Sequence, residues 1–429
     1  MPPRPRPPLQ WDLVAESFTE AVFLWARWQD AMDSPRHDLR DVVHWVEGRL
    51  RGGIDGTRLG GQRAVDELLL PALGGRRPRP AAVAAHLLAS MGRAGIEHVV
   101  AAMLAAGPDR LPALRRGLEA SAGAQWPSVL VEFLPQLPAD VQAAVLDALA
   151  FRRWPLPPGI DAMVDRGAKA VQLASLRLAT TVRDKWTKPY IEWGLRRSDQ
   201  QLRVEATRAA LLRALEGATA KAGDLIRDNV PGSDVLLPLV ASGAGERLLP
   251  VIQSRLRARH GSARPLFDAL ATIGTVAAAQ LAASLLDHRE HARLAADALR
   301  AITGLDPSPP PGVVPEADCP RDELLLPTPA PELLRERWLE LRPSLDPKRR
   351  YLQGEAFDPE QLPQWLARAP MRRRHALADE LAMRTGGASQ IVTTTWTRVQ
   401  WAQLDALRPA APGERPPRLS AMPSGAHAH

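Results

Sequence analysis

Four ten-residue stretches decide the predicted fold: VQAAVLDALA (141–150), VQLASLRLAT (171–180), VEATRAALLR (204–213) and LAADALRAIT (294–303). Each carries Ala and Leu at helical spacing without the alternation of a strand. Similar stretches recur every 29 to 33 residues, beginning near Pro80, Leu111, Val141, Val171, Val204, Val235, Pro265 and Leu294. This period suits a helix–turn–helix unit, and such units stack because one hairpin cannot bury both of its apolar stripes. The alternative is an irregular all-α domain whose Ala-rich composition imitates a period.

The residues before the repeats do not share this phase. The stretch from Trp11 to Met32 reads as one amphipathic helix, and residues 38–50 and 61–73 predict two more. A repeat array needs atypical ends to cover its open apolar faces. We therefore predict an N-terminal helical cap over residues 11–75, preceded by a disordered Pro/Arg-rich arm over residues 1–10.

The residues after the repeats divide into three zones. Residues 306–331 form a proline-dense linker that cannot hold a helix. Residues 332–404 hold several Trp residues and predict a small α-rich domain, and residues 405–429 predict a disordered tail. The predicted fold class is all-α, a HEAT-like α-solenoid over residues 76–305 with an N-terminal helical cap and a small C-terminal α-rich domain.

Composition excludes several protein classes. The 429 residues carry 55 Lys+Arg against 48 Asp+Glu, and because few of the cations are Lys, the high isoelectric point is an arginine effect. A single cysteine, Cys319, excludes an internal disulfide framework and a Cys-based zinc cluster. The start has no apolar signal region, and the uncharged run 269–286 reads as two buried helices with a turn at Gly274. A soluble cytoplasmic protein is expected, with no membrane partner.

The two ends of the chain carry a resemblance to a known family. The stretch from Glu20 to Gly61, which includes FLW and RLRGGIDGTRLGG, resembles the opening of a bacterial family of HEAT-like conserved hypothetical proteins. AITGLD (301–306), RRYLQG (349–354) and MRRRHALADELAMRTGG (371–387) extend the match. The resemblance implies an association with type VI secretion, because family members are often encoded near PAAR-like spike-tip and adaptor genes. Where the family has several Arg residues after FLW, this chain has Arg27, Trp28 and Gln29.

An aromatic and basic segment, RDKWTKPYIEWGLRR (183–197), is the first candidate binding site. Trp186, Tyr190 and Trp193 would share one helical face, with Arg196 and Arg197 beside them. Cations contact phosphates and aromatic rings stack on bases, so this mixture suits a nucleic-acid groove. The alternative is that the Trp residues are core anchors flanked by a solvated charged surface.

A second candidate site lies in RRYLQG. Arg349, Arg350 and Tyr351 could contact an acidic partner, because Arg and Tyr are favoured interface anchors. The alternative is that Tyr351 and Gly354 shape a turn that docks the C-terminal domain on the last repeat. The Gly pairs at 52–53, 60–61, 74–75 and 386–387 are predicted to be helix-end turns.

The sequence favours a binding protein over an enzyme. It holds no P-loop, no GxSxG and no HEXXH motif, and His288 and His291 lack further metal ligands, so no cofactor, metal or catalytic residue is predicted. The predicted function is a non-enzymatic, protein-binding scaffold or adaptor that assists assembly or effector loading of a type VI secretion system. Its expected partners are spike, PAAR-like or adaptor proteins. The alternative is a HEAT-like DNA-binding or base-excision protein with a basic concave surface, in which Asp184 would be the catalytic residue.

Overall fold

The computed structural model describes residues 9–182, 187–258, 262–308, 323 and 326–407. The regular secondary structure of these residues is helical apart from one two-stranded hairpin formed by β1 (Tyr351–Leu352) and β2 (Glu355–Ala356). The prediction of an all-α fold is confirmed. The predicted arm, linker and tail fall largely outside the described ranges.

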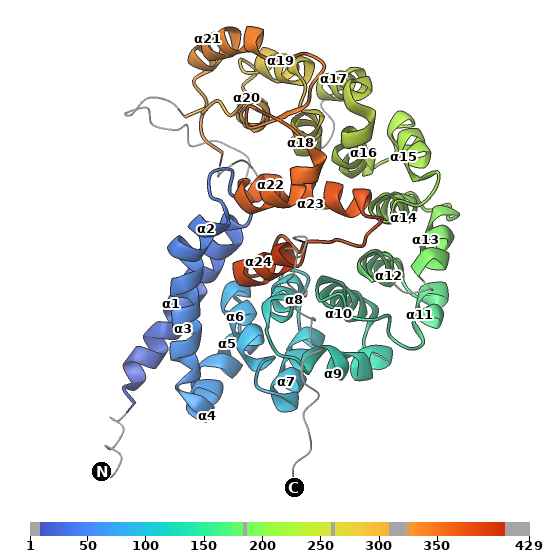
Figure 1. Ribbon diagram of the computed structural model, residues 1–429. Coiled ribbons are helices and arrows are strands. Elements are labelled where there is room, and N and C mark those ends of the chain that lie inside the picture. Colours follow the sequence, from blue (N-terminus) through green and yellow to red (C-terminus); the bar gives the residue numbers. More distant parts are fainter. Residues whose placement is uncertain (1–8, 183–186, 259–261, 309–322, 324–325, 408–429) are drawn as a thin grey trace, which may run out of the picture.

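Two layers of helices follow the chain in an arc (Figure 1). The inner layer consists of α6 (Pro78–Leu88), α8 (Leu111–Ala120), α10 (Ala139–Phe151), α12 (Lys169–Thr181), α14 (Gln200–Leu212), α16 (Leu237–Ala244), α18 (Arg264–Ile273) and α20 (Ala292–Thr303). The outer layer consists of α7 (Arg93–Leu104), α9 (Trp126–Phe133), α11 (Ile160–Arg166), α13 (Thr187–Leu195), α15 (Ala218–Arg227), α17 (Leu249–Ala258), α19 (Val276–Ser284) and α21 (Pro331–Leu341). Each predicted repeat start lies within four residues of the start of an inner helix.

Arginines at the ends of inner helices bind the preceding inner helix. Arg152, directly after α10, donates to the carbonyl of Ser121 at the end of α8 over 3.2 Å. Arg213, directly after α14, donates to the carbonyl of Val182 at the end of α12 over 2.8 Å. The last carbonyls of a helix lack intrahelical donors. Arg152 and Arg213 therefore supply hydrogen-bond donors to the carbonyls at the ends of two inner helices, α8 and α12. These contacts account for two of the many arginines in the chain.

The N-terminal helices pack closely through glycine. α1 (Trp11–Ala31) lies against α3 (Gly48–Arg58), which continues α2 (Leu39–Val42) through a π-helical stretch, Val43–Glu47. α4 (Gly61–Ala64), the π-helical stretch Val65–Leu69 and α5 (Leu70–Gly74) follow. A Cβ at Gly53 would lie 2.9 Å from the Ser17 carbonyl oxygen, so this contact requires glycine. The prediction of a turn at Gly52–Gly53 is wrong, because the pair lies inside α3 where α1 approaches.

The uncharged run 269–286 forms two helices, as predicted. α18 ends at Ile273, Gly274 has φ +66°, and α19 begins at Val276 after a side-chain cap from Thr275. Another stretch, Ser233–Ala258, is by length and composition apolar enough to cross a membrane. It bends within its length, because Gly245, between α16 and α17, has φ +56°.

The β1–β2 hairpin caps the C-terminal ends of two inner helices, α18 and α20. The backbone N–H of Tyr351 donates to the carbonyl of Gly274 over 2.7 Å, and those of Gln353 and Gly354 donate to the carbonyls of Ala301 and Ile302, each over 2.8 Å. These carbonyls belong to the C-terminal ends of α18 and α20, which need donors. The structure therefore contains the second of the two arrangements predicted for RRYLQG, in which this motif docks on the last repeats.

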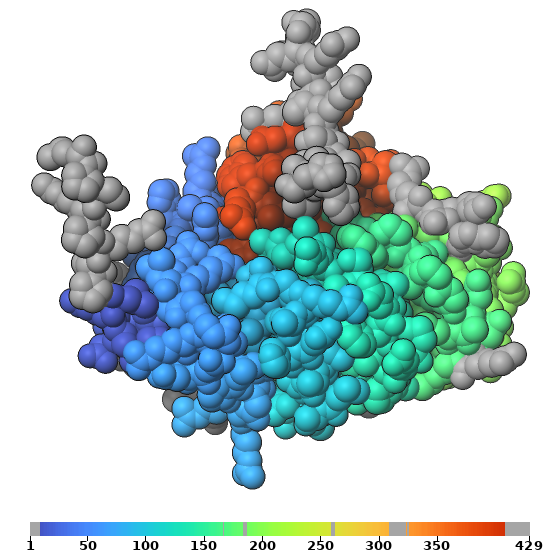
Figure 2. Space-filling model, turned by 90° about the horizontal axis from the view of Figure 1, so that it is seen from below, coloured from blue at the N-terminus to red at the C-terminus, as the bar shows by residue number. Residues whose placement is uncertain are grey.

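The C-terminal helices lie inside the arc. α22 (Leu362–Arg368), α23 (Met371–Arg384) and α24 (Thr397–Asp405) occupy its centre (Figure 1), and the space-filling view shows these orange residues beside the blue and cyan helices (Figure 2). Their apolar side chains share one core with α1, α6 and α8. The inner wall is therefore covered by the protein itself along part of its length.

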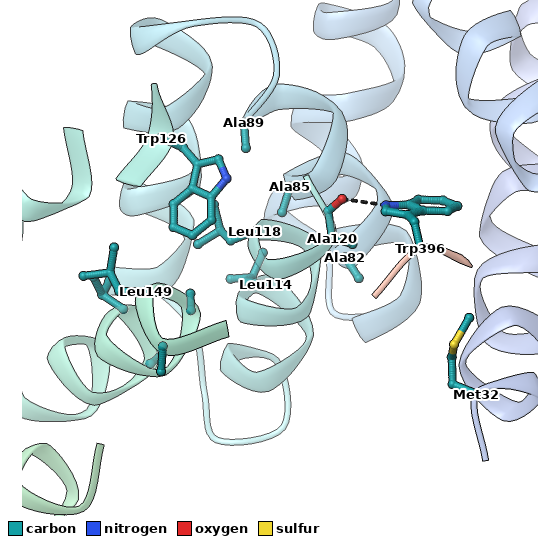
Figure 3. Packing of buried hydrophobic residues seen from close by; sticks show 14 of the residues in the cluster. Met32, Ala82, Ala85, Ala89, Leu114, Leu118, Ala120, Trp126, Leu149 and Trp396 are labelled. Atoms are coloured by element: carbon teal, nitrogen blue, oxygen red, sulfur yellow. Dashed lines mark hydrogen bonds between the residues drawn. The ribbon is translucent and has the colours of Figure 1, made fainter. Parts of the chain in front are cut away.

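A cluster of aromatic rings joins the C-terminal segment to the first helices. The Trp396 indole N–H donates to the Ala120 carbonyl over 2.7 Å (Figure 3), and its ring stacks on Trp28 with centroids 4.7 Å apart. The ring of His86 also lies beside the Trp396 ring, tilted to it, with centroids 5.7 Å apart. Glu47 accepts from the Trp28 indole N–H over 3.0 Å and from the Thr397 backbone N–H over 2.7 Å. Burial raises the pKa of Glu47, and the bonds from Thr397 and Trp28 oppose this rise.

Replacing Gly274 with Ala is expected to destabilise the protein. An added Cβ would lie 2.7 Å from the Tyr351 carbonyl oxygen at a positive φ, so we expect a loss of about 2 kcal/mol or more in the free energy of unfolding, measured by urea denaturation. Gly223→Ala is the control, because Gly223 lies inside α15 with open space around it. It should gain about 0.5 kcal/mol. Equal effects of the two variants would contradict the packing argument.

His86 is expected to make folding sensitive to acid. Burial, with the nearby charges of Arg58 and Arg398, lowers its pKa to about 3. The unfolded chain takes up this proton near pH 6.5, so the contribution to stability is complete above pH 6.5 and declines as the pH falls toward 3. Between pH 7 and pH 4, wild type should lose roughly 3 kcal/mol more than His86→Phe in urea unfolding. The exposed His98 provides the control variant, His98→Gln, which should follow wild type.

Candidate functional site

The described part of the aromatic and basic segment, residues 187–197, consists of α13 in the outer layer and the two residues that follow it (Figure 1). Trp186, like Asp184, is outside the described residues. The Tyr190 hydroxyl donates to the Asp161 carboxylate on α11, and burial together with this carboxylate raises the pKa of Tyr190. Trp193 packs into two hydrophobic clusters, with the guanidinium of Arg197 4.2 Å from its ring centroid. Tyr190 and Trp193 are thus used in packing, whereas Arg196 and Arg197 are exposed.

The three residues predicted in RRYLQG are at a different place, where the hairpin meets α18 and α20. Arg350 forms a bidentate pair with Glu380 on α23, with both distances 2.8 Å, and its guanidinium lies 3.9 Å from the centroid of Phe357. Tyr351 is buried, and its hydroxyl accepts from the Asp346 backbone N–H over 2.7 Å. Arg349 is exposed and lies 3.6 Å from the Asp346 carboxylate. The structure does not bring those candidate residues that it describes together into one site.

A cluster of buried charge lies at the start of α23, where the sequence has three consecutive arginines. The side chains of Arg372 and Arg373 are 1% and 8% exposed. Arg373 lies 3.0 Å from Asp268 on α18 and also contacts Asp297 on α20. Burial lowers the pKa of Arg373, but the nearby carboxylates of Asp297 and Asp268 raise it, and the net shift is upward. Two inner helices therefore hold the first turn of α23.

The same cluster reaches the end of α1. Asp33 accepts two hydrogen bonds from the Arg264 guanidinium at the start of α18, over 2.5 and 2.8 Å. Arg372 lies 3.4 Å from Asp33 and 3.2 Å from Asp297. The backbone N–H of Arg372 donates to the Ser34 carbonyl over 3.0 Å. Asp33 thus connects the first helix of the chain to α18 and to α23, and we name these charges the aspartate–arginine cluster: Asp33, Asp268, Asp297, Arg264, Arg372 and Arg373.

Sequence reasoning missed this cluster, although one signal was present. Three arginines at the N-terminal end of a helix oppose its dipole, so they require carboxylates from elsewhere. The third, Arg374, is fully buried and donates to the Gln400 side chain over 2.6 Å. Burial lowers the pKa of Arg374 to about 9. Gln400 in turn donates to the carbonyls of Thr393 and Thr395, over 2.9 and 2.7 Å, and fixes the segment before α24.

A cleft of about 570 Å³ separates α23 from the inner wall of the arc, and we call it the central cleft. One wall carries charged side chains of α8, α10, α12 and α14, and the opposite wall consists of α23 and residues 390–392. Along the first wall, Asp147 accepts from Arg115 over 2.7 Å and from Arg177 over 2.6 and 3.0 Å. Arg208 follows, 3.6 Å from Glu205. Opposite charges therefore alternate along the described inner wall.

A second cleft, of about 600 Å³, lies between α17 and α19 and includes His288 and His291. Across the described ranges of the chain, no group of three or more His, Cys, Asp or Glu side chains is placed to hold a metal ion. The central cleft is the candidate site, because it gathers charged side chains from four consecutive inner helices.

Comparisons with known proteins give no family. No protein-family model matches the sequence, and no curated protein matches it. Among solved structures, the crystal structure of an engineered protein aligns with 86% of this chain and 99% of its own, at 14% identity and a TM-score of 0.26. An alignment with so low a TM-score carries no argument about fold or function.

Removing one aspartate of the aspartate–arginine cluster is expected to be costly. Asp297→Asn leaves Arg372 and Arg373 buried beside an uncharged group, so unfolding free energy should fall by about 3 kcal/mol or more. Asp224→Asn is the control, because the Asp224–Arg227 pair is exposed and should contribute less than about 1 kcal/mol. Urea denaturation at pH 7 measures both. A loss as small for Asp297→Asn as for Asp224→Asn would contradict the structural role of the cluster.

Proposed function

We propose that this protein is a non-enzymatic, protein-binding scaffold or adaptor. The supporting observation is a set of exposed apolar side chains on and beside the first helices, which we call the N-terminal apolar face: Leu9, Leu13, Phe23, Val43, Trp45 and Leu59. These are six of the ten large hydrophobic side chains exposed in the described part of the chain. A concentration of exposed apolar residues is typical of a protein-interaction surface.

The N-terminal apolar face draws on two neighbouring helical segments. On α1, Glu20 follows the exposed Leu13 by seven residues and precedes the exposed Phe23 by three, so by helical spacing it lies between these two side chains. Glu20 accepts a hydrogen bond from Arg49 on α3 over 2.7 Å, which links this part of α1 to the segment that carries Trp45. Phe23 is 59% exposed and Trp45 is 70% exposed. Large aromatic side chains of this kind supply most of the binding energy at many protein interfaces.

The location of this face favours partner binding at the N-terminal end of the arc. The inner wall, where the sequence suggested that a partner would bind, is partly covered by α22–α24. The proposed partners are spike, PAAR-like or adaptor proteins of a type VI secretion system, and this assignment rests on the resemblance of the sequence alone.

The alternative, a DNA-binding or base-excision protein, predicts a basic concave surface. The described inner wall alternates in charge instead, from Arg115 through Asp147 to Arg177, and Arg196 and Arg197 directly follow α13, a helix of the outer layer. Neither observation favours DNA binding over protein binding, so the scaffold remains the proposal.

Charge placed on the N-terminal apolar face is expected to abolish partner binding. The native protein, purified by affinity with nuclease treatment and analysed by mass spectrometry, should retain spike, PAAR-like or adaptor proteins. The double variant Phe23→Glu, Trp45→Glu should lose at least about tenfold of that recovery, because truncating central aromatic anchors costs 2 kcal/mol or more. Its melting temperature should not change, since both side chains are exposed.

Leu339→Glu, on the exposed surface of α21, is the matched control and should bind as wild type does. Equal recovery with all variants, or recovery of none of these proteins, would contradict the proposal. Retention of duplex DNA that falls steeply with rising salt would instead support the DNA-binding alternative.

A further inference from the structure

Guanidinium groups outnumber ionised carboxylates around the central cleft. Four arginines line it: Arg115, Arg153, Arg177 and Arg208. Three carboxyl groups line it as well: Glu119, Asp147 and Asp379. Burial raises the pKa of Glu119 and of Asp379, although nearby arginines oppose the rise in both. With four arginines against three carboxyl groups, the lining carries a positive charge even when all three carboxyl groups are ionised, which favours an anion in the cleft.

The existing ion pairs neutralise these arginines only in part. Arg115 lies 3.2 Å from Glu119 and shares Asp147 with Arg177, and Arg208 lies 3.6 Å from Glu205. The Arg153 guanidinium donates to a neutral group, the carbonyl of Gln390, and its buried Nε has no hydrogen-bond partner within the described residues. Burial lowers the pKa of Arg153, which is the response of a cation without a nearby counter-charge.

The far wall adds a carboxyl group without a partner. Asp379 projects from α23 into the cleft, and no hydrogen bond or ion pair to it occurs among the residues that the structure describes. Arg208 is the charged group that most affects it. When protonated, Asp379 can donate a hydrogen bond to an oxyanion, and when ionised it repels one.

We propose that the central cleft binds a small oxyanion with two or more negative charges, a polycarboxylate or a phosphate, between Arg153, Arg177 and Arg208. Guanidinium groups match the geometry of carboxylate and phosphate oxygens and bind them through charge-assisted hydrogen bonds. The volume of about 570 Å³ lies within the range of small-molecule sites. This binding site goes beyond the proposed scaffold function and does not depend on it.

The apolar side chains that line the central cleft would interact differently with a polycarboxylate and with inorganic phosphate. Small aliphatic groups line the cleft between the charges: Ala150, Leu212, Ala378, Ala382, Ile391 and Val392. They would contact the carbon skeleton of an organic acid, whereas inorganic phosphate would make only the polar contacts. A tighter affinity for citrate than for phosphate would identify the organic source, and the reverse order would identify phosphate; either order is compatible with the oxyanion site.

The test is calorimetric titration of citrate and of inorganic phosphate into the full-length protein at pH 7 and constant ionic strength. We expect at least one anion to bind with a millimolar or lower dissociation constant. Arg208→Ala should weaken binding about tenfold, because a charge-assisted contact is lost. Asp379→Asn should tighten binding severalfold, because the amide removes the repulsion of an ionised carboxylate and supplies a hydrogen-bond donor.

Opposite effects at Arg208 and Asp379 distinguish the central cleft from general charge effects. Arg227→Ala on the outer helix α15 removes the same charge outside the cleft, and it should leave binding unchanged. Arg208 is a third exposed and its pair with Glu205 is long, so its removal should not unfold the protein, which circular dichroism would check. Absence of binding by both anions, or equal weakening by Arg208→Ala and Arg227→Ala, would overturn the proposal.

Discussion

The aspartate–arginine cluster is the constraint on which the arrangement of this protein depends. Asp33 lies just after the first helix, Asp268 and Asp297 belong to the last two inner helices, and Arg372 and Arg373 lie in the first turn of α23. Each charge is costly to bury alone and acceptable only beside its partners. The first helix, the last inner helices and the C-terminal segment therefore have to assemble together, since any one of them alone would leave charges uncompensated.

The position of the C-terminal segment changes which surfaces remain for function. Trp396 stacks on Trp28 and donates to the Ala120 carbonyl, so residues more than 270 apart in sequence form one core. Where α22–α24 cover the inner wall, that wall becomes interior. Two of the surfaces that remain exposed are the N-terminal apolar face and the central cleft, one apolar and the other charged, and these differ in the class of ligand that they suit.

Sequence reasoning was most accurate where the signal is local. The starts of the inner helices follow the spacing of Ala- and Leu-rich stretches, and Gly274 ends α18 because an αL position favours glycine. The prediction of a turn was wrong at Gly52–Gly53, where glycine instead permits close approach of α1 to α3. Among the candidate site residues, Tyr351 and Arg350 dock the hairpin and α23, and Trp193 contributes to packing. The sequence alone left these roles undecided, because distant neighbours decide whether an aromatic or basic side chain is buried.

The sequence by itself determined that the chain is helical, how long each helical unit is, and where glycine ends a helix, because these depend on side chains within a few residues of one another. Only the tertiary structure decided that Arg372, Arg373 and Arg374 are buried instead of solvated, and that Asp147, Arg177 and Arg208 line one cleft with Asp379. The reason is physical: the environment of a charge depends on which distant groups compensate it, and the pairing of Asp33 with Arg264 and Arg372 leaves no periodic trace in the sequence.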